Sequence, residues 1–232
     1  KVLDAACLNV ERPRNICHKT RIVADSKILI RMDNDDTRAI GSSAENQLYN
    51  KLKYNIDDIK VVVVSDYHKG CISEALLKKI KVLCGLKKVK ILYDTKRLCS
   101  FQDSFLLKMK IDDFESVADG EDTGVLSDKI IDFKHRHHIQ NMLVTMGEKG
   151  ADFVDENDHC THLSTVCNEA VSTCGAGDSM MAAIAVCLAN EIDIHSAVTF
   201  ANYAAAAACQ HEKTYAVSMD DVKELWHTSC LW

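Results

Sequence analysis

Apolar and polar residues follow two different periods along the chain, and from residue 44 onward the two periods take turns. Short apolar runs of strand length lie at 61–64, 89–93, 105–109, 142–145 and 151–154. Helical spacing of apolar residues, with one at every third or fourth position, covers 44–55, 73–83, 112–118, 122–137, 176–189, 194–210 and 218–227. Strands that alternate with helices are typical of a parallel sheet with helices on both faces. The pattern therefore predicts an α/β fold with a doubly wound parallel sheet flanked by helices.

Individual segments sharpen this prediction. Val61 to Val64 are four consecutive β-branched residues, which indicates a strand buried on both faces. Ser73 stands before the second helical segment and is a good N-cap residue. The run at 151–154 follows the run at 142–145 closely, so we expect it to pair as the second arm of a hairpin.

The first 40 residues follow a different pattern. Residues 1–19 show no clear period, and residues 20–31 read as two short strands around a turn at Asp25 and Ser26. We therefore expect an N-terminal remnant with a small β flap or lid at 1–40 and an α/β core at 41–232. The acidic stretch from Asp33 to Asp36 lacks the glycine and the closing glutamate of a calcium-binding loop, which favours a solvated loop.

Composition narrows the class of protein. The chain has 232 residues, of which 47% are hydrophobic, enough for one packed core. A net charge of −6 without a long basic run argues against nucleic acid as the main partner. The two long apolar helices are interrupted by polar residues, so neither predicts a membrane span. Eleven scattered cysteines without a C-x-x-C pair indicate reduced thiols and a cytoplasmic protein.

The clearest candidate for chemistry is the turn before the helix at 176–189. Gly175, Ala176 and Gly177 precede Asp178, and glycines let the backbone turn tightly into a helix. The free N–H groups and the dipole at a helix N-terminus favour an anion. Asp178 has two interpretations: a helix-capping or first-turn acid, or a general base beside a phosphate that is being transferred.

Further polar groups follow the predicted strands, where ligands bind in open α/β sheets. The first loop, Ser65–Gly70, carries Asp66 and Lys69, which suit a charged substrate, although a surface turn is an equal alternative. The second group contains an acid and a base at Asp94 and Lys96. The third loop holds Gly147 and Gly150, which by themselves indicate only a hairpin turn. Three histidines at 135, 137 and 138 have no carboxylate at ligand spacing, so we expect a solvated helix end.

Taken in order, these segments resemble a known family. Ser-Asp-Tyr-x-Lys-Gly, Asp-x-Lys, Val-Thr-x-Gly-x-x-Gly, Gly-Ala-Gly-Asp and Phe-Ala-Asn-x-Ala-Ala are similar to motifs of the ribokinase-like (PfkB) carbohydrate kinases. Within that family the order is closest to the branch that phosphorylates heptose 7-phosphates in ADP-heptose synthesis. The resemblance runs from about Thr20 to about Lys223.

The resemblance implies roles for individual residues. The amides of Gly175, Ala176 and Gly177 would form an anion hole, and Asp178 would take the proton from the sugar hydroxyl. The implied nucleotide-binding residues are Thr145, Gly147, Gly150, Asn202 and Lys110. The implied substrate or phosphate residues are Asp66, Lys69 and Lys96, and the implied metal ligand is Asp113. The implied cofactors are ATP and Mg²⁺, and a homodimer formed through the β flap is expected.

The chain also departs from the family pattern. Where members carry Asn-x-x-Glu, this chain has Lys110-Ile-Asp-Asp113, and Ser172 replaces the usual Asp. The family's opening segment, with its Gly-Gly sugar-binding signature, has no match here, so we expect sugar recognition to be incomplete or supplied differently. The sequence therefore predicts an ATP-dependent sugar kinase that phosphorylates D-glycero-β-D-manno-heptose 7-phosphate at the anomeric hydroxyl. The alternative is a non-catalytic remnant that binds a nucleotide or a sugar phosphate and has a regulatory role.

Overall fold

The computed structural model describes residues 14–24, 27–96, 102–118, 124–167 and 170–229. By its internal contacts the chain divides into two compact units. The first comprises Lys1–Asp58 and Asp66–Lys87, and the second comprises Ile59–Ser65 and Lys88–Trp232. The division expected from the sequence, 1–40 against 41–232, stays a prediction. No helix in the described part of the chain is long and apolar enough to cross a membrane.

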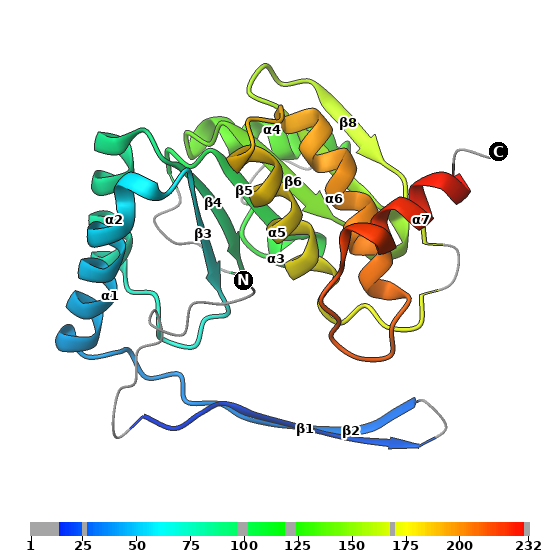
Figure 1. The fold of residues 1–232 in the computed structure, drawn as a ribbon, viewed down its shortest axis with the longest axis horizontal. Coiled ribbons are helices and arrows are strands. Elements are labelled where there is room, and N and C mark those ends of the chain that lie inside the picture. Colours follow the sequence, from blue (N-terminus) through cyan, green and yellow to red (C-terminus); the bar gives the residue numbers. More distant parts are fainter. Residues whose placement is uncertain (1–13, 25–26, 97–101, 119–123, 168–169, 230–232) are drawn as a thin grey trace. The chain divides into compact units, whose positions relative to one another are not determined.

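The first unit begins with a two-stranded antiparallel hairpin (Figure 1). Strands β1 (His18–Ala24) and β2 (Lys27–Asn34) pair with Ile22 opposite Ile30. The pairing shifts register between Ile22 and Val23, as a β-bulge does. The two strands predicted at residues 20–31 are confirmed, whereas the predicted turn at Asp25 and Ser26 lies outside the described residues. Every described side chain of β1 is exposed.

Two helices complete the first unit. Helix α1 (Ser42–Asn55) runs into a 3₁₀ turn, η2 (Ile56–Asp58), and packs against α2 (Glu74–Lys87). The Ser73 hydroxyl oxygen accepts a hydrogen bond from the Leu76 N–H at 3.0 Å and donates one to Glu45 at 2.7 Å. This confirms the serine cap predicted for the second helix, because such a bond satisfies an N–H group that the helix leaves open.

The second unit is built on a six-stranded sheet. In spatial order its strands are β3 (Val61–Asp66), β4 (Lys90–Thr95), β5 (Leu106–Lys110), β6 (Asn141–Thr145), β7 (Ala151–Val154) and β8 (Cys160–Leu163). The pairs β4–β5 and β5–β6 are parallel, whereas β6–β7 and β7–β8 are antiparallel. The parallel part of the sheet and the hairpin arm after β6 are thus confirmed. Strand β8 was not predicted.

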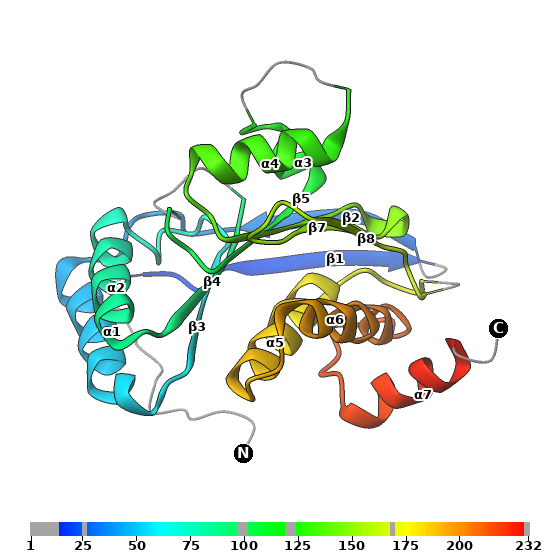
Figure 2. The same cartoon turned by 90° about the horizontal axis from the view of Figure 1, so that it is seen from above.

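Helices cover both faces of this sheet (Figure 2). Helices α3 (Ile111–Glu115) and α4 (Leu126–Arg136) lie on one face. Helices α5 (Ala176–Ala189) and α6 (Ile194–Cys209) lie on the other, and α7 (Met219–Ser229) packs against α6. The flanked α/β architecture predicted from the alternating pattern is therefore confirmed. Helix α3 ends at Glu115, earlier than the predicted residue 118, and the predicted start of α4 at residue 122 lies outside the described residues.

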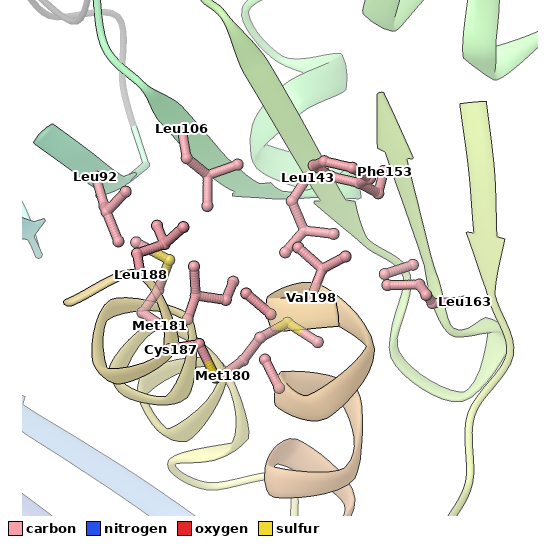
Figure 3. Close-up of a cluster of buried hydrophobic side chains, with 14 residues drawn as sticks. Leu92, Leu106, Leu143, Phe153, Leu163, Met180, Met181, Cys187, Leu188 and Val198 are labelled. Atoms are coloured by element: carbon pink, nitrogen blue, oxygen red, sulfur yellow. The ribbon is translucent and has the colours of Figure 1, made fainter. Parts of the chain in front are cut away.

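The core between the sheet and the helices α5 and α6 explains their apolar spacing (Figure 3). Leu92, Leu106 and Leu143 come from three neighbouring strands and are completely buried. Ile184 of α5 and Val198 of α6 belong to the same cluster. Successive strand residues point to opposite faces. Residues two apart on a strand therefore share a face. Because Leu106 packs against α5, Lys108 and Lys110 of the same strand lie on the face that is covered by α5.

One prediction about burial is wrong. Val61 to Val64 form a strand, but only Val64 is buried, and Val63 is 40% exposed. The reason is position, since β3 is the first strand of the sheet and, among the described strands, has a neighbour on one side only. An edge strand can carry the same β-branched residues as a central one, so the residue types alone do not distinguish the two.

Candidate active site

Helix α5 begins in a glycine turn. Gly175 is the N-cap and adopts the left-handed backbone conformation, with φ 88°, which glycine reaches without a side-chain clash. The Ser179 N–H donates to the Gly175 carbonyl at 2.9 Å, which is the first hydrogen bond of the helix. The N–H groups of Ala176, Gly177 and Asp178 precede this bond and carry the positive end of the helix dipole. That of Ala176 donates to the Thr173 carbonyl at 3.4 Å. The turn predicted from the sequence is confirmed, while its binding of an anion stays a prediction.

Asp178 is the third residue of α5, and its side chain is exposed. The N-cap position belongs to Gly175, so Asp178 does not cap the helix in the usual way. A carboxylate in the first turn still interacts favourably with the helix dipole, typically by about 0.3–1 kcal/mol. Asp178 is therefore not the N-cap but an exposed first-turn acid, which fits the structural interpretation, and its role as a general base stays a prediction.

Residues from two other segments hold this turn. The Ser172 hydroxyl oxygen accepts the Cys174 N–H at 3.2 Å, and the Ser172 N–H donates to the Cys209 carbonyl at 3.1 Å. The Cys174 sulfur lies 3.3 Å from the Thr214 hydroxyl oxygen. A Cβ atom on Gly175 would lie 3.2 Å from the Thr214 side chain. Ser172, which replaces the usual Asp of the family, thus orders the backbone that leads into the helix.

A buried lysine lies against the same turn. Lys108 of β5 is 2% exposed, and a Cβ atom built on Gly177 would lie 3.1 Å from its Nζ atom. The Nζ atom forms an ion pair with Asp94 Oδ2 at 2.8 Å, and the two residues are register partners on β4 and β5. Lys108 was not predicted as a site residue from the sequence. The available signal was a charged residue in the middle of the apolar run Leu106–Met109.

Two predicted nucleotide residues meet at the ends of neighbouring strands. Lys110 and Thr145 are register partners on β5 and β6. The Thr145 hydroxyl donates to the Met109 carbonyl at 3.4 Å, so it is partly engaged by the sheet. Since Lys108 lies two residues before Lys110 on the same face of β5, this pair stands at the strand end next to the α5 turn.

The two predicted glycines lie in the turn after β6. Gly147 begins the 3₁₀ turn η3 (Gly147–Lys149), and the Gly150 N–H donates to the Gly147 carbonyl at 3.0 Å. Gly147 and Gly150 have φ values of 63° and 85°, in the left-handed region. This turn leads directly into β7, so both glycines have a clear structural role. Their contact with a nucleotide stays a prediction.

Metal binding has one candidate ligand here. Lys110 is the N-cap of α3, and Asp113 lies in its first turn, half-buried. No group of three His, Cys, Asp or Glu side chains within the described residues is arranged to hold a metal ion. A single carboxylate fits Mg²⁺ only if phosphate oxygens and water supply most of the coordination, which is how Mg²⁺ usually binds in kinases. His135, expected at a solvated helix end, is exposed and pairs with Asp158 at 2.8 Å.

Asn202 connects α6 to the segment after β8. Its Nδ2 atom donates to the Ser164 carbonyl at 2.8 Å. The amide therefore fixes a loop in the structure, and its predicted place near the nucleotide base is not tested by this contact.

The predicted substrate residues are divided between the units. Asp66 and Lys69 belong to the first unit and Lys96 to the second. The Asp66 carboxylate is buried and accepts the His68 N–H at 2.9 Å. The Lys69 ammonium forms an ion pair with Asp35, and this hydrogen bond is the main reason that the pKa of Asp35 is lowered. Lys96 is exposed and directly precedes residues 97–101, which lie outside the described part.

The acidic stretch at 33–36 is more ordered than predicted. Asp36 is 9% exposed, and its carboxylate pairs with Arg38 at 2.5 Å. The Arg38 hydrogen bond, with a further bond from the Asn15 N–H, holds the pKa of Asp36 far below its usual range. The expectation of a solvated loop is wrong for Asp36, because basic residues distant in sequence, among them Arg14, gather around this stretch.

Comparisons with known proteins agree on one family. The family described as "pfkB family carbohydrate kinase" matches residues 18–221. The bifunctional protein HldE of Aliarcobacter butzleri is 28% identical over 96% of this chain and 47% of its own length. HldE of Campylobacter jejuni is 30% identical over 92% of this chain and 46% of its own length. The chain thus spans about half the length of these relatives.

Solved structures support the fold. Phosphofructokinase-2 from Escherichia coli, in complex with substrates and products, has a TM-score of 0.72 and 20% identity, over 90% of this chain and 69% of its own. Ribokinase of Arabidopsis thaliana, complexed with ribose and ATP, has a TM-score of 0.62 and 16% identity, over 77% of this chain and 58% of its own.

Proposed function

Because the chain belongs to the PfkB family of carbohydrate kinases, we propose that it transfers the terminal phosphoryl group of ATP to a hydroxyl group of a sugar phosphate. The observation that carries this proposal is the turn at the start of α5. There a left-handed glycine, an open helix N-terminus and an exposed acid stand together. Phosphoryl transfer needs an anion-binding site and one base in this arrangement.

In the proposed mechanism Asp178 is the general base. Its carboxylate accepts the proton of the acceptor hydroxyl while that oxygen forms a bond to the γ-phosphorus, and the bond to the ADP oxygen breaks. The N–H groups of Gly175, Ala176 and Gly177 stabilise the negative charge on the phosphoryl oxygens. A base of this kind usually contributes about 10²–10⁴ in rate.

The nucleotide is proposed to lie along the ends of β5 and β6. Lys110 and Thr145 would face its phosphates, the Gly147–Gly150 turn would border it, and Asn202 would lie near its base. Mg²⁺, when bound, would neutralise phosphate charge, with Asp113 as its ligand from this chain. Lys110 stands where the family has an amide. Its positive charge would neutralise part of the phosphate charge, so that less of this charge would have to be neutralised by the metal ion. A reaction that uses ATP fits a cytoplasmic protein.

The first acceptor to test is D-glycero-β-D-manno-heptose 7-phosphate at its anomeric hydroxyl. This choice rests on the order of motifs and on the HldE relatives. In this proposal Asp66, Lys69 and Lys96 would contact the acceptor or its phosphate. The test is a coupled assay of ADP release over a panel of sugar phosphates, with Asp178→Asn as the inactive control. Turnover with other sugar phosphates but not with the heptose would contradict the proposed substrate, whereas the proposed kinase activity would stand.

A second candidate is a non-catalytic module that binds a nucleotide or a sugar phosphate. Lys110 favours this second candidate, because this lysine takes the place of an amide that the family carries close to the metal ion. Calorimetric binding of ATP without ADP release on any acceptor would support this module over the kinase.

We also propose that the β1–β2 hairpin forms a homodimer. Ile22 and Ile30 are opposite each other and are 45% and 52% exposed, and Met32 is 52% exposed. A two-stranded hairpin alone is only marginally stable. Burial of its exposed apolar side chains against a second copy of the hairpin would therefore stabilise it. Sedimentation velocity of the full chain should give a dimer, and the double variant Ile22→Lys with Ile30→Lys should give a monomer. A wild-type monomer at high concentration would contradict the dimer.

A further inference from the structure

A charged group is buried where a helix already presents positive charge. The side chain of Lys108 is 3% exposed, and its Nζ atom lies 3.1 Å from the position of a Cβ atom on Gly177. Gly177 is in the first turn of α5. The ammonium group carries three N–H donors, and Asp94 at 2.8 Å accounts for one of them.

This arrangement brings two sources of positive charge together at one turn. The N-terminus of a helix carries roughly half a positive charge, so a cation beside it is repelled. Removing an ammonium ion from water costs several kcal/mol in addition, and one carboxylate offsets this only with good geometry. Asp178 brings a negative charge to the same turn, but its side chain is exposed and screened by solvent. A phosphoryl group bound at the turn would be attracted by both positive groups.

We propose that Lys108 is a positioning residue for phosphoryl transfer, whose ammonium group, fixed by Asp94 against Gly177, adds positive charge to the anion-binding turn from within the sheet. This inference rests on the proposed function and assigns a role to two residues outside the Gly-Ala-Gly-Asp motif. The ligand it serves is the terminal phosphate of a nucleoside triphosphate. Fixed positive groups in a site that excludes water stabilise transferred charge more strongly than the same groups in water.

The same geometry explains the glycine at 177. A Cβ atom there would approach the Nζ atom closely enough that the ammonium group would have to move by a few tenths of an ångström. Alanine at this position would therefore displace the charge without removing it. The backbone of Gly177 is not in the left-handed region, so alanine adds no strain of that kind.

The main test compares two buried lysines. Lys134 of α4 has a 4% exposed side chain and pairs with Asp158 at 2.6 Å. Helix α4 lies on the opposite face of the sheet from α5 (Figure 2). Lys108→Met and Lys134→Met therefore remove matched charges. Calorimetry would measure the affinity of each full-length variant for AMP-PNP, a non-hydrolysable ATP analogue, and for AMP, which lacks the terminal phosphates. Turnover would be measured with the best acceptor.

We expect Lys108→Met to weaken AMP-PNP binding about tenfold or more and to leave AMP binding within about twofold. Its kcat should fall by about tenfold to a hundredfold. Lys134→Met should lower the melting temperature and change neither affinity. Wild-type affinity for AMP-PNP in Lys108→Met, or an equal loss for AMP, would overturn the positioning role. A wild-type chain that binds neither nucleotide would overturn the proposed function instead, and this inference with it.

A second variant keeps the proposal testable if Lys108→Met does not fold. Gly177→Ala retains the ion pair and should melt near the wild type, whereas its AMP-PNP affinity and kcat should each fall several-fold. The control is Gly85→Ala in α2, where a Cβ atom would meet nothing within 4 Å. Unchanged affinity and kcat in a folded Gly177→Ala would also overturn the proposal.

Discussion

Gly150 lies so close to Leu163 that a Cβ atom on Gly150 would stand 2.1 Å from the Leu163 carbonyl oxygen. The contact joins the turn after β6 to the end of β8, and backbone atoms on both sides leave no side chain that can move away. Gly150 also has φ 85° and ψ −138°, a conformation that is essentially restricted to glycine.

Gly150→Ala should therefore destabilise the protein by more than about 3 kcal/mol, because steric overlap adds to backbone strain. Gly147→Ala is the matched control. It also has a positive φ, of 63°, but a Cβ atom there would meet nothing within 4 Å, so the cost should be about 1–2 kcal/mol. Urea denaturation of both variants measures the difference. Equal losses would show that the contact with Leu163 is not maintained in solution.

A second prediction concerns acid stability. The hydrogen bond from Lys134 is the main reason that the pKa of Asp158 is lowered, and His135 adds to it. Because the folded pKa lies below that of an unfolded Asp, about 3.9, the pair stabilises the fold above about pH 4. Its contribution is lost as the pH falls further.

Asp158→Asn should cost about 1–3 kcal/mol at pH 7, less than a fully buried pair, since 37% of the Asp158 side chain is exposed. The difference from the wild type should shrink as the pH is lowered from 5 to 3. Denaturation curves at several pH values check this. A difference that stays constant down to pH 3 would rule out the ion pair as its source.

Amide hydrogen exchange should separate the β1–β2 hairpin from the central strands. The hairpin has two strands and exposed side chains, and a pair of strands alone is only marginally stable. Exchange should be fast across β1 and slow across β5 and β6, whose residues 106–109 and 141–144 are buried. Equal protection in both regions would show that the hairpin does not open independently of the central strands.

The sequence predicted most helices and strands because their apolar spacing is set by one buried core. The spacing of Met180, Ile184 and Leu188, for example, follows directly from packing against the sheet. The short strand β8 was not predicted, because three of its four residues are exposed and it therefore carries no apolar pattern. Its position is fixed by pairing with β7, which is tertiary information.

The site was predictable only where a local motif encodes it. The glycine turn before α5 was predictable because consecutive residues of the sequence form it. The Asp94–Lys108 pair was not, because the two residues meet across neighbouring strands and the contact with Gly177 comes from a third element. In the same way, Asp36 owes its low pKa to Arg38 and to the distant Asn15 N–H, which the acidic run alone does not indicate.

The decisive prediction concerns Asp178. Asn at this position keeps the size of the side chain and much of its hydrogen bonding, but it does not accept a proton at neutral pH. If Asp178 is the base, Asp178→Asn should lower kcat by about 10²–10⁴ and leave ATP affinity nearly unchanged. The stability loss should stay within about 1 kcal/mol, because Gly175 and not Asp178 is the N-cap, and a first-turn acid interacts with the helix dipole by about that amount.

Two measurements on one variant separate the two roles of Asp178. Turnover is compared with the wild type on the same acceptor, and the melting temperature reports the structural contribution. Asp193→Asn is a suitable control, because Asp193 caps α6 by accepting the Ser196 N–H at 2.9 Å. That variant should change stability slightly and turnover not at all. An Asp178→Asn variant that melts below the wild type yet keeps full turnover would make Asp178 a structural acid, and the base would then have to be sought elsewhere.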